Sequence, residues 1–147
     1  QGHSITLVSF LRPEEVQHLP ALEKICSAVH AVPIRRSRLV DAGYMIRSYL
    51  TGRPFLVERD DLRPMQELVN NLISQGEYDF LHADQLTMVQ FALRGATVAK
   101  NKKPKVIFDA HNAVWSILER MRENALWFLQ PILAIEANAS NATKVNY

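Results

Sequence analysis

The chain has 147 residues, a net charge of +2 at pH 7 and a hydrophobic share of 48%. This length fits one domain with a real core, and the composition excludes wholesale disorder. The small net charge gives no argument for nucleic acid as a partner, and no apolar run is long enough to span a bilayer. The single cysteine, Cys26, cannot form an internal disulfide, and its apolar spacing predicts a core position in a reducing compartment.

The first half of the chain predicts a β-α-β start followed by two helices. A β-branched, apolar run predicts a strand at 5–11, and Pro13 with two following acids favours a helical turn that an apolar stripe continues to Val29. A short strand is expected at 31–34. Helices are expected at 40–50 and at 62–75, where Gly76 ends the second one.

The second half predicts two more strands, at 78–82 and 105–108, each followed by a helix. These helices are expected at 85–100 and 113–124. Strands that alternate with helices predict an α/β fold of parallel βαβ units, with helices on both faces of the sheet. The apolar residues run continuously along the strands, which agrees with this fold because parallel sheets are buried on both faces.

A basic stretch includes the predicted helix at 40–50 and the residues on either side of it. Residues 35–53 contain five arginines and one aspartate, which gives a net charge of +4. The simplest interpretation is a solvated, mobile segment. The alternative is a surface that binds phosphate or an anionic membrane. The residues concerned are Arg35, Arg36, Arg38, Arg47 and Arg53, with Asp41 as the single acid.

Polar side chains follow the last two predicted strands at the point where each strand ends. In YDFLHAD these are His82 and Asp84, and in VIFDAHN they are Asp109, His111 and Asn112. Ligands of open α/β sheets bind outside the carboxyl ends of the strands, so we expect both clusters to line one cleft, with both histidines at the same edge. Asp84 and Asn112 also suit helix N-caps, and either histidine could tie down a neighbouring loop.

These segments resemble motifs in the N-terminal domain of GT-B nucleotide-sugar glycosyltransferases of the group 1, or family 4, type. YDFLHAD is similar to a segment in which an aspartate and two hydrophobic residues lead into H-x-H or H-x-D, and VIFDAHN to a hydrophobic strand followed by D-x-H-N. GHSITLVSF resembles the second strand of that domain, and RPF and WSILERM occur in the family's order. The resemblance covers about residues 2–136.

The resemblance implies that 2–137 form a Rossmann-like domain, a parallel sheet with helices on both faces and the N-terminal half of a GT-B fold. Such a domain binds the sugar acceptor opposite a C-terminal domain that binds the nucleotide-sugar donor, and it is inactive alone. Asp84 would be catalytic, because it stands where many members have the second histidine of H-x-H. No cofactor or metal is implied, and the residues expected to bind substrates are His82, Gln85, Asp109, His111 and Asn112.

The same resemblance predicts an unusual chain order. GHSITLV reads as the entry to a second strand, so the usual first strand and helix, like the donor domain, would not be within 2–137. In 138–147, Ser140 to Ala142 resemble a remnant of tag removal, and the last five residues resemble the start of a first strand. We therefore expect a partial or rearranged chain, in a cytoplasmic protein compatible with a peripheral location at an inner membrane.

Two other functions fit parts of the sequence. The histidines and carboxylates of HAD and DAH are suitable ligands for a metal-dependent, phosphoesterase-like hydrolase. A non-catalytic module could instead bind phosphate or an anionic membrane through 35–53, with the apolar segment 127–133 at the interface. In the glycosyltransferase interpretation the same arginines would attract a lipid-linked acceptor.

Overall fold

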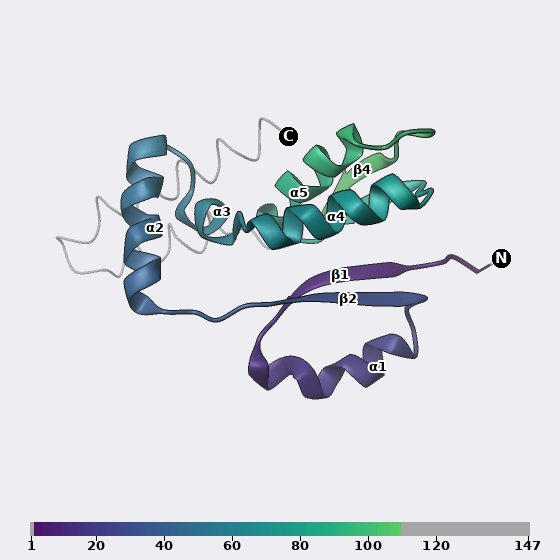
Figure 1. The fold of residues 1–147 in the computed structure, drawn as a ribbon, viewed down its shortest axis with the longest axis horizontal. Coiled ribbons are helices and arrows are strands. Elements are labelled where there is room, and N and C mark those ends of the chain that lie inside the picture. The colour runs from purple at the N-terminus through teal and green to yellow at the C-terminus, as the bar shows by residue number, and fades with distance from the viewer. Residues whose placement is uncertain (1, 110–147) are drawn as a thin grey trace.

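The computed structural model of the protein describes residues 2–109, in which helices and strands alternate along the chain (Figure 1). Its strands are β1 (Thr6–Leu11), β2 (Ala28–Pro33), β3 (Phe80–Ala83) and β4 (Lys105–Phe108). A 3-10 helix, η1 (Pro13–His18), leads into the short α1 (Leu19–Glu23). Three helices, α2 (Arg38–Thr51), α3 (Phe55–Asp60) and α4 (Arg63–Gln75), lie between β2 and β3, and α5 (Leu86–Thr97) lies between β3 and β4.

The strands form two parallel pairs. β1 pairs with β2, from Thr6 opposite Ala28 to Leu11 opposite Pro33. β3 pairs with β4 in the same way, and Ala83 at its end lies opposite Phe108. Within 2–109 each pair is a separate two-stranded sheet. The fold is therefore α/β with parallel strands, as predicted, but the described residues do not form one continuous Rossmann-like sheet.

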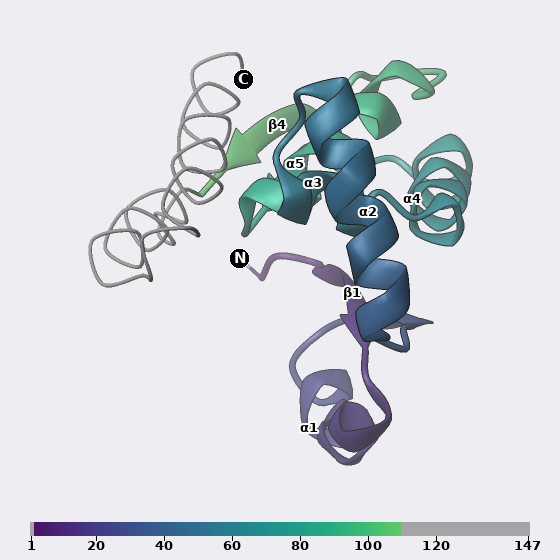
Figure 2. The same ribbon diagram turned by 90° about the vertical axis from the view of Figure 1, so that its left-hand side faces the viewer.

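The β1–β2 pair has helices on both of its faces. α1 lies on one side of it, and α4 and α5 lie on the other (Figures 1 and 2). Phe10 of β1 meets Phe91 of α5 edge to face, with ring centroids 6.3 Å apart. Apolar residues of four elements complete this core: Val8, Val32, Met65, Leu68, Val69 and Met88.

The β3–β4 pair packs one face against α5. Side chains alternate along a strand, so Leu81 and Ala83 share this face, while Phe80 and His82 lie on the other. On the second face Phe80 is 56% exposed and Ile107 44% exposed. The α5 side is a second core, formed by Val57, Leu86, Val89, Ala92 and Leu93 with Val106 and Phe108 of β4.

Glycine is required at two places in the helices. Gly52 ends α2 in the left-handed conformation, with φ of 67°, which glycine adopts without strain. Gly95 lets α5 approach α4 closely, because a Cβ atom there would lie 2.6 Å from Cδ1 of Ile73 and 2.8 Å from Cγ1 of Val69. Both positions fix how the helices turn and pack above the strands.

Most predicted elements are confirmed, with shifted ends, but two predictions are wrong and one helix was not predicted. The stripe to Val29 is not one helix: η1 and α1 end at Glu23, and β2 begins at Ala28 because β-branched Val29 pairs with Leu7 of β1. Cys26 is half-buried in the loop before β2 rather than in the core. Helix α3 was not expected at all. The predicted helix at 113–124 lies outside the described residues.

Candidate functional site

The ends of β3 and β4 place two acidic residues next to each other on paired strands. Asp84 and Asp109 each follow directly after the last residue of a strand, and those last residues, Ala83 and Phe108, lie opposite each other. The Asp109 N–H donates to the Ala83 carbonyl at 2.9 Å, so the pairing continues to the edge itself. Neighbouring strands lie about 5 Å apart. Both aspartates are exposed, and we call this edge the strand-end site.

Two other predicted residues lie beside this edge. His82 is exposed, pairs with Ile107 across the strands and lies on the face turned away from α5. Gln85 is the N-cap of α5, and its side chain makes no capping hydrogen bond. The prediction that Asp84 itself is the N-cap is therefore wrong, because the extended backbone continues one residue further, through Gln85, before the helix begins. Asp84 stands just outside the helix, where a ligand can approach.

Two of the predicted residues, His111 and Asn112, lie outside the described residues. The expectation that both histidines share one edge therefore stays a prediction. Within 2–109 no group of three or more histidine, cysteine or acidic side chains is placed to hold a metal ion.

A second charged cluster surrounds the acidic residues Glu58, Asp60 and Asp61 at α3, and we call it the α3 network. The side chain of Glu58 has 0% exposure. Its carboxylate accepts from Arg53 at 3.0 Å and from the Thr51 hydroxyl at 3.3 Å, and it lies 3.3 Å from Nε of Arg47. Gln90 of α5 also accepts from Arg53, at 2.9 Å. Arg53 thus joins α3 to α5, while Thr51 and Arg47 of α2 contact the same glutamate.

The two acids that follow Glu58 are paired as well. Asp60 is held by Arg36 at 2.7 Å and by Arg59 at 2.9 Å. Asp61 accepts two hydrogen bonds from Arg94, at 2.6 and 2.9 Å, and one from each terminal nitrogen of Arg53, at 3.2 Å. The hydrogen bonds from Arg94 are the main reason that the pKa of Asp61 lies below its ordinary value, although burial opposes this shift.

The α3 network corrects the interpretation of 35–53 as a solvated, mobile segment. Most of that segment is helix α2, and three of its five arginines pair with buried or half-buried carboxylates. Buried charges require such partners, because an unpaired charge is costly in a protein interior. The acids were present in the sequence as Glu58, Asp60 and Asp61, directly after the basic stretch. The alternation of these acids with arginines was the signal in the sequence that could have predicted the ion pairs.

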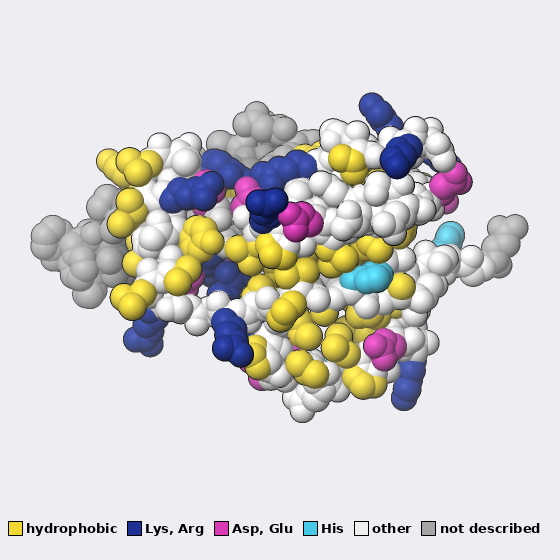
Figure 3. Space-filling view, in the orientation of Figure 1, with side chains coloured by type: hydrophobic (Ala, Val, Ile, Leu, Met, Phe, Trp, Pro, Cys, Tyr) yellow, Lys and Arg dark blue, Asp and Glu magenta, His cyan; other side chains and the backbone are white. Residues whose placement is uncertain are grey.

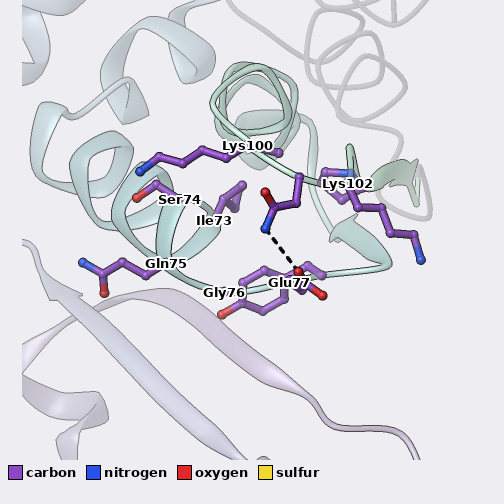
Figure 4. A pocket seen from close by; sticks show the side chains of 11 residues that line it. Ile73, Ser74, Gln75, Gly76, Glu77, Lys100 and Lys102 are labelled. Carbon is purple, nitrogen blue, oxygen red and sulfur yellow. Dashed lines mark hydrogen bonds between the residues drawn. The ribbon is translucent and has the colours of Figure 1, made fainter.

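A small pocket lies at the opposite end of the β3–β4 pair (Figure 4). Its volume is about 140 Å³, and its lining comes from 73–78, before β3, and from 99–104, before β4. Asn101 donates to Glu77 across it at 3.3 Å. Just beside it, Lys102 donates to Asp79 and thereby lowers the pKa of that exposed carboxyl. This amino end of parallel strands is not where α/β sheets bind their ligands.

Comparison with known protein families, with characterised proteins and with solved structures found no match. Among the described helices, none combines the length and the apolar character needed to cross a bilayer. The function must therefore be argued from the geometry of the chain itself.

Proposed function

We propose that the chain is the acceptor-binding domain of a glycosyltransferase, which moves a sugar from a nucleotide-sugar to an acceptor. The observation that carries this proposal is the adjacency of Asp84 and Asp109 at the carboxyl ends of two paired parallel strands. Carboxylates at such an edge are suited to accept hydrogen bonds from sugar hydroxyls. Their exposure also suits half of a cleft, whose other wall would be the donor-binding domain.

The proposed reaction assigns Asp84 an electrostatic role. The oxygen of an acceptor hydroxyl forms a bond to the anomeric carbon of the donor and gives its proton to the departing diphosphate, whose bond to that carbon breaks. The diphosphate leaves with the electron pair, so positive charge develops on the sugar ring. The carboxylate of Asp84 stabilises this charge or orients a sugar hydroxyl. Asp109, His82 and Gln85 bind the acceptor around it.

We further propose that both strand pairs belong to one Rossmann-like sheet. Within 2–109, β1 and β3 each have one neighbouring strand, so each has an edge whose backbone groups bond to no other described strand. Helices α4 and α5 already contact both pairs, since Met88 packs against both cores. A parallel strand from outside the described residues, placed between β1 and β3, would satisfy both edges.

Binding and turnover by the isolated chain test the proposal. Saturation-transfer NMR with methyl glycosides should detect binding, and Asp84→Asn should weaken it about tenfold, because a charged hydrogen bond becomes a neutral one. Asp79→Asn is the matched control, since Asp79 precedes the same strand and is equally a surface acid. No transfer from nucleotide sugars is expected. Transfer by the chain alone, or equal effects of the two variants, would contradict the proposal.

A further inference from the structure

The inner side of α2 is polar. Ser48 is buried there, and its hydroxyl donates to the Arg53 carbonyl at 2.7 Å. Asp41, seven residues earlier, lies on the same side and is half-buried. The helix is thus fixed to the rest of the molecule by hydrogen bonds and ion pairs rather than by its apolar side chains. Figure 2 views it from its outer side, with the other described helices behind or beside it.

The outer side of α2 is apolar and faces solvent. Leu39 is 86% exposed, Ile46 65%, Tyr49 75% and Leu50 77%. Their spacing of seven, three and one residues places them on one face of the helix, which we call the α2 outer face. Val40 and Met45, at its borders, are 55% and 50% exposed. Figure 3 shows these hydrophobic side chains gathered over α2 at the left of the view.

Such an arrangement inverts the usual orientation of a surface helix, whose apolar face packs on the core. Single exposed hydrophobic residues are ordinary, but a contiguous exposed patch marks a surface that binds something. The α3 network explains why the inversion is stable, because it holds the polar side of α2 inward. It does not explain why the outer face is apolar.

The charges around the α2 outer face indicate its partner. Arg38 and Arg47 flank the apolar residues on the two sides of the helix, and Arg35 precedes its first turn. Arg35 and Arg38 are exposed and make no ion pair with any residue in 2–109. The single acid of α2, Asp41, is on the inner side. An apolar strip bordered by arginines, with no acid among them, complements a surface of anionic headgroups above an acyl layer.

We propose that α2 docks on an anionic lipid bilayer, with its outer face buried at the boundary between headgroups and acyl chains. A helix of 14 residues is too short to cross the hydrocarbon core, so it lies along the surface. Arg35 and Arg38 bind lipid phosphates, and the stem of Arg47 lies along the interface while its head stays paired with Glu58. This site is independent of the strand-end site and does not require glycosyl transfer.

Co-sedimentation of the 147-residue chain with vesicles tests the proposal. Vesicles of phosphatidylcholine with phosphatidylglycerol should bind the chain, and pure phosphatidylcholine vesicles should bind it about tenfold or more weakly. Leu39→Ser/Ile46→Ser/Leu50→Ser should reduce the partition coefficient by roughly tenfold or more, because each replaced side chain loses its apolar contact. Arg35→Gln/Arg38→Gln should reduce it by about tenfold, and only with the anionic vesicles.

Matched controls distinguish binding through the α2 outer face from non-specific binding to vesicles. Val16→Ser/Ile25→Ser removes two apolar side chains that are 51% and 74% exposed near α1, and Lys24→Gln/Lys103→Gln removes two exposed charges elsewhere. Neither control should alter vesicle binding, and circular dichroism should show all variants folded. Equal binding to both kinds of vesicle, or loss of binding in the controls alone, would overturn the proposal. The proposal would also be overturned if the chain sediments as a dimer and the triple variant as a monomer, while both bind vesicles equally.

Discussion

The strand-end site and the α3 network both gather acidic side chains, but they place them in opposite surroundings. Glu58, Asp60 and Asp61 are buried or half-buried and each is held by at least one arginine. Asp84 and Asp109 are exposed at the ends of two strands. Acids of the first kind stabilise a fold only through their partners, whereas acids of the second kind are accessible to a ligand. The comparison therefore separates buried charges that hold the helices together from exposed charges that a ligand can reach.

The largest effect is expected where the α3 network loses its central donor. Arg53→Met should lower the free energy of unfolding by about 3 to 5 kcal/mol, because the carboxylate of Glu58 stays buried without its closest charged donor. Urea unfolding followed by circular dichroism measures this. Arg35→Met is the control, since Arg35 is exposed and unpaired within 2–109, and it should change the same quantity little. Equal losses in both variants would show that the network contributes nothing specific.

The next largest effect is expected at the strand-end site, where a substitution should change the activation free energy of the reaction rather than the free energy of unfolding. In a protein that joins this domain to the donor-binding domain we propose, Asp84→Asn should lower kcat by about 10²-fold, which corresponds to about 3 kcal/mol of transition-state stabilisation. The melting temperature should hardly change, because the exposed side chain is not the N-cap of α5. Steady-state kinetics beside a thermal melt separates the two outcomes. An unchanged kcat would remove Asp84 from the site.

The α3 network should also respond to acid in a defined direction. The folded pKa of Asp61 lies below the ordinary value of 3.8, so its carboxylate stabilises the fold above that pH. This contribution is lost as the pH falls through the lowered folded pKa. Asp61→Asn should therefore cost about 1 kcal/mol near neutral pH, a figure reduced by solvent screening, and almost nothing in strong acid. Urea unfolding across that pH range would contradict this if the difference grew on acidification.

The smallest effect is expected where a pair is fully solvated. Arg63 and Glu67 form an i,i+4 pair on α4, with side chains 90% and 57% exposed. Arg63→Gln should change the free energy of unfolding by no more than about 0.5 kcal/mol, and high salt should erase the difference. A loss comparable with that of Arg53→Met, in the same urea assay, would mean that burial does not decide which ion pairs matter here.

The strand-end site could be predicted from the sequence because its signal is local. A run of apolar residues that changes to Asp or His within one or two positions shows where a strand leaves the core. The parallel pairing of β3 with β4 then brings Asp84 and Asp109 together without further information. The same local signal does not fix the exact start of α5, because Asp84 and Gln85 are both polar residues that can follow the end of a strand.

The α3 network could not be predicted in the same way, because its partners are distant in sequence. Arg53 bonds to Gln90, which is 37 residues away, and Arg94 bonds to Asp61 across 33 residues. Periodicity shows which face of a helix is apolar, but it does not show whether that face turns inward. For α2 the usual assumption fails, since the hydrogen bond of Ser48 and the ion pair of Arg47 keep the polar side inside.

The most direct test of the central claim, that sugars bind at the strand ends, is an NMR titration of the chain with methyl glycosides. The claim predicts that amide chemical shifts change at residues 82–85 and 109, at the carboxyl ends of β3 and β4. Amides of the α3 network, at 57–61, should stay unchanged. Shifts confined to 73–78 and 99–104, around the pocket at the opposite end of the same strands, would contradict it.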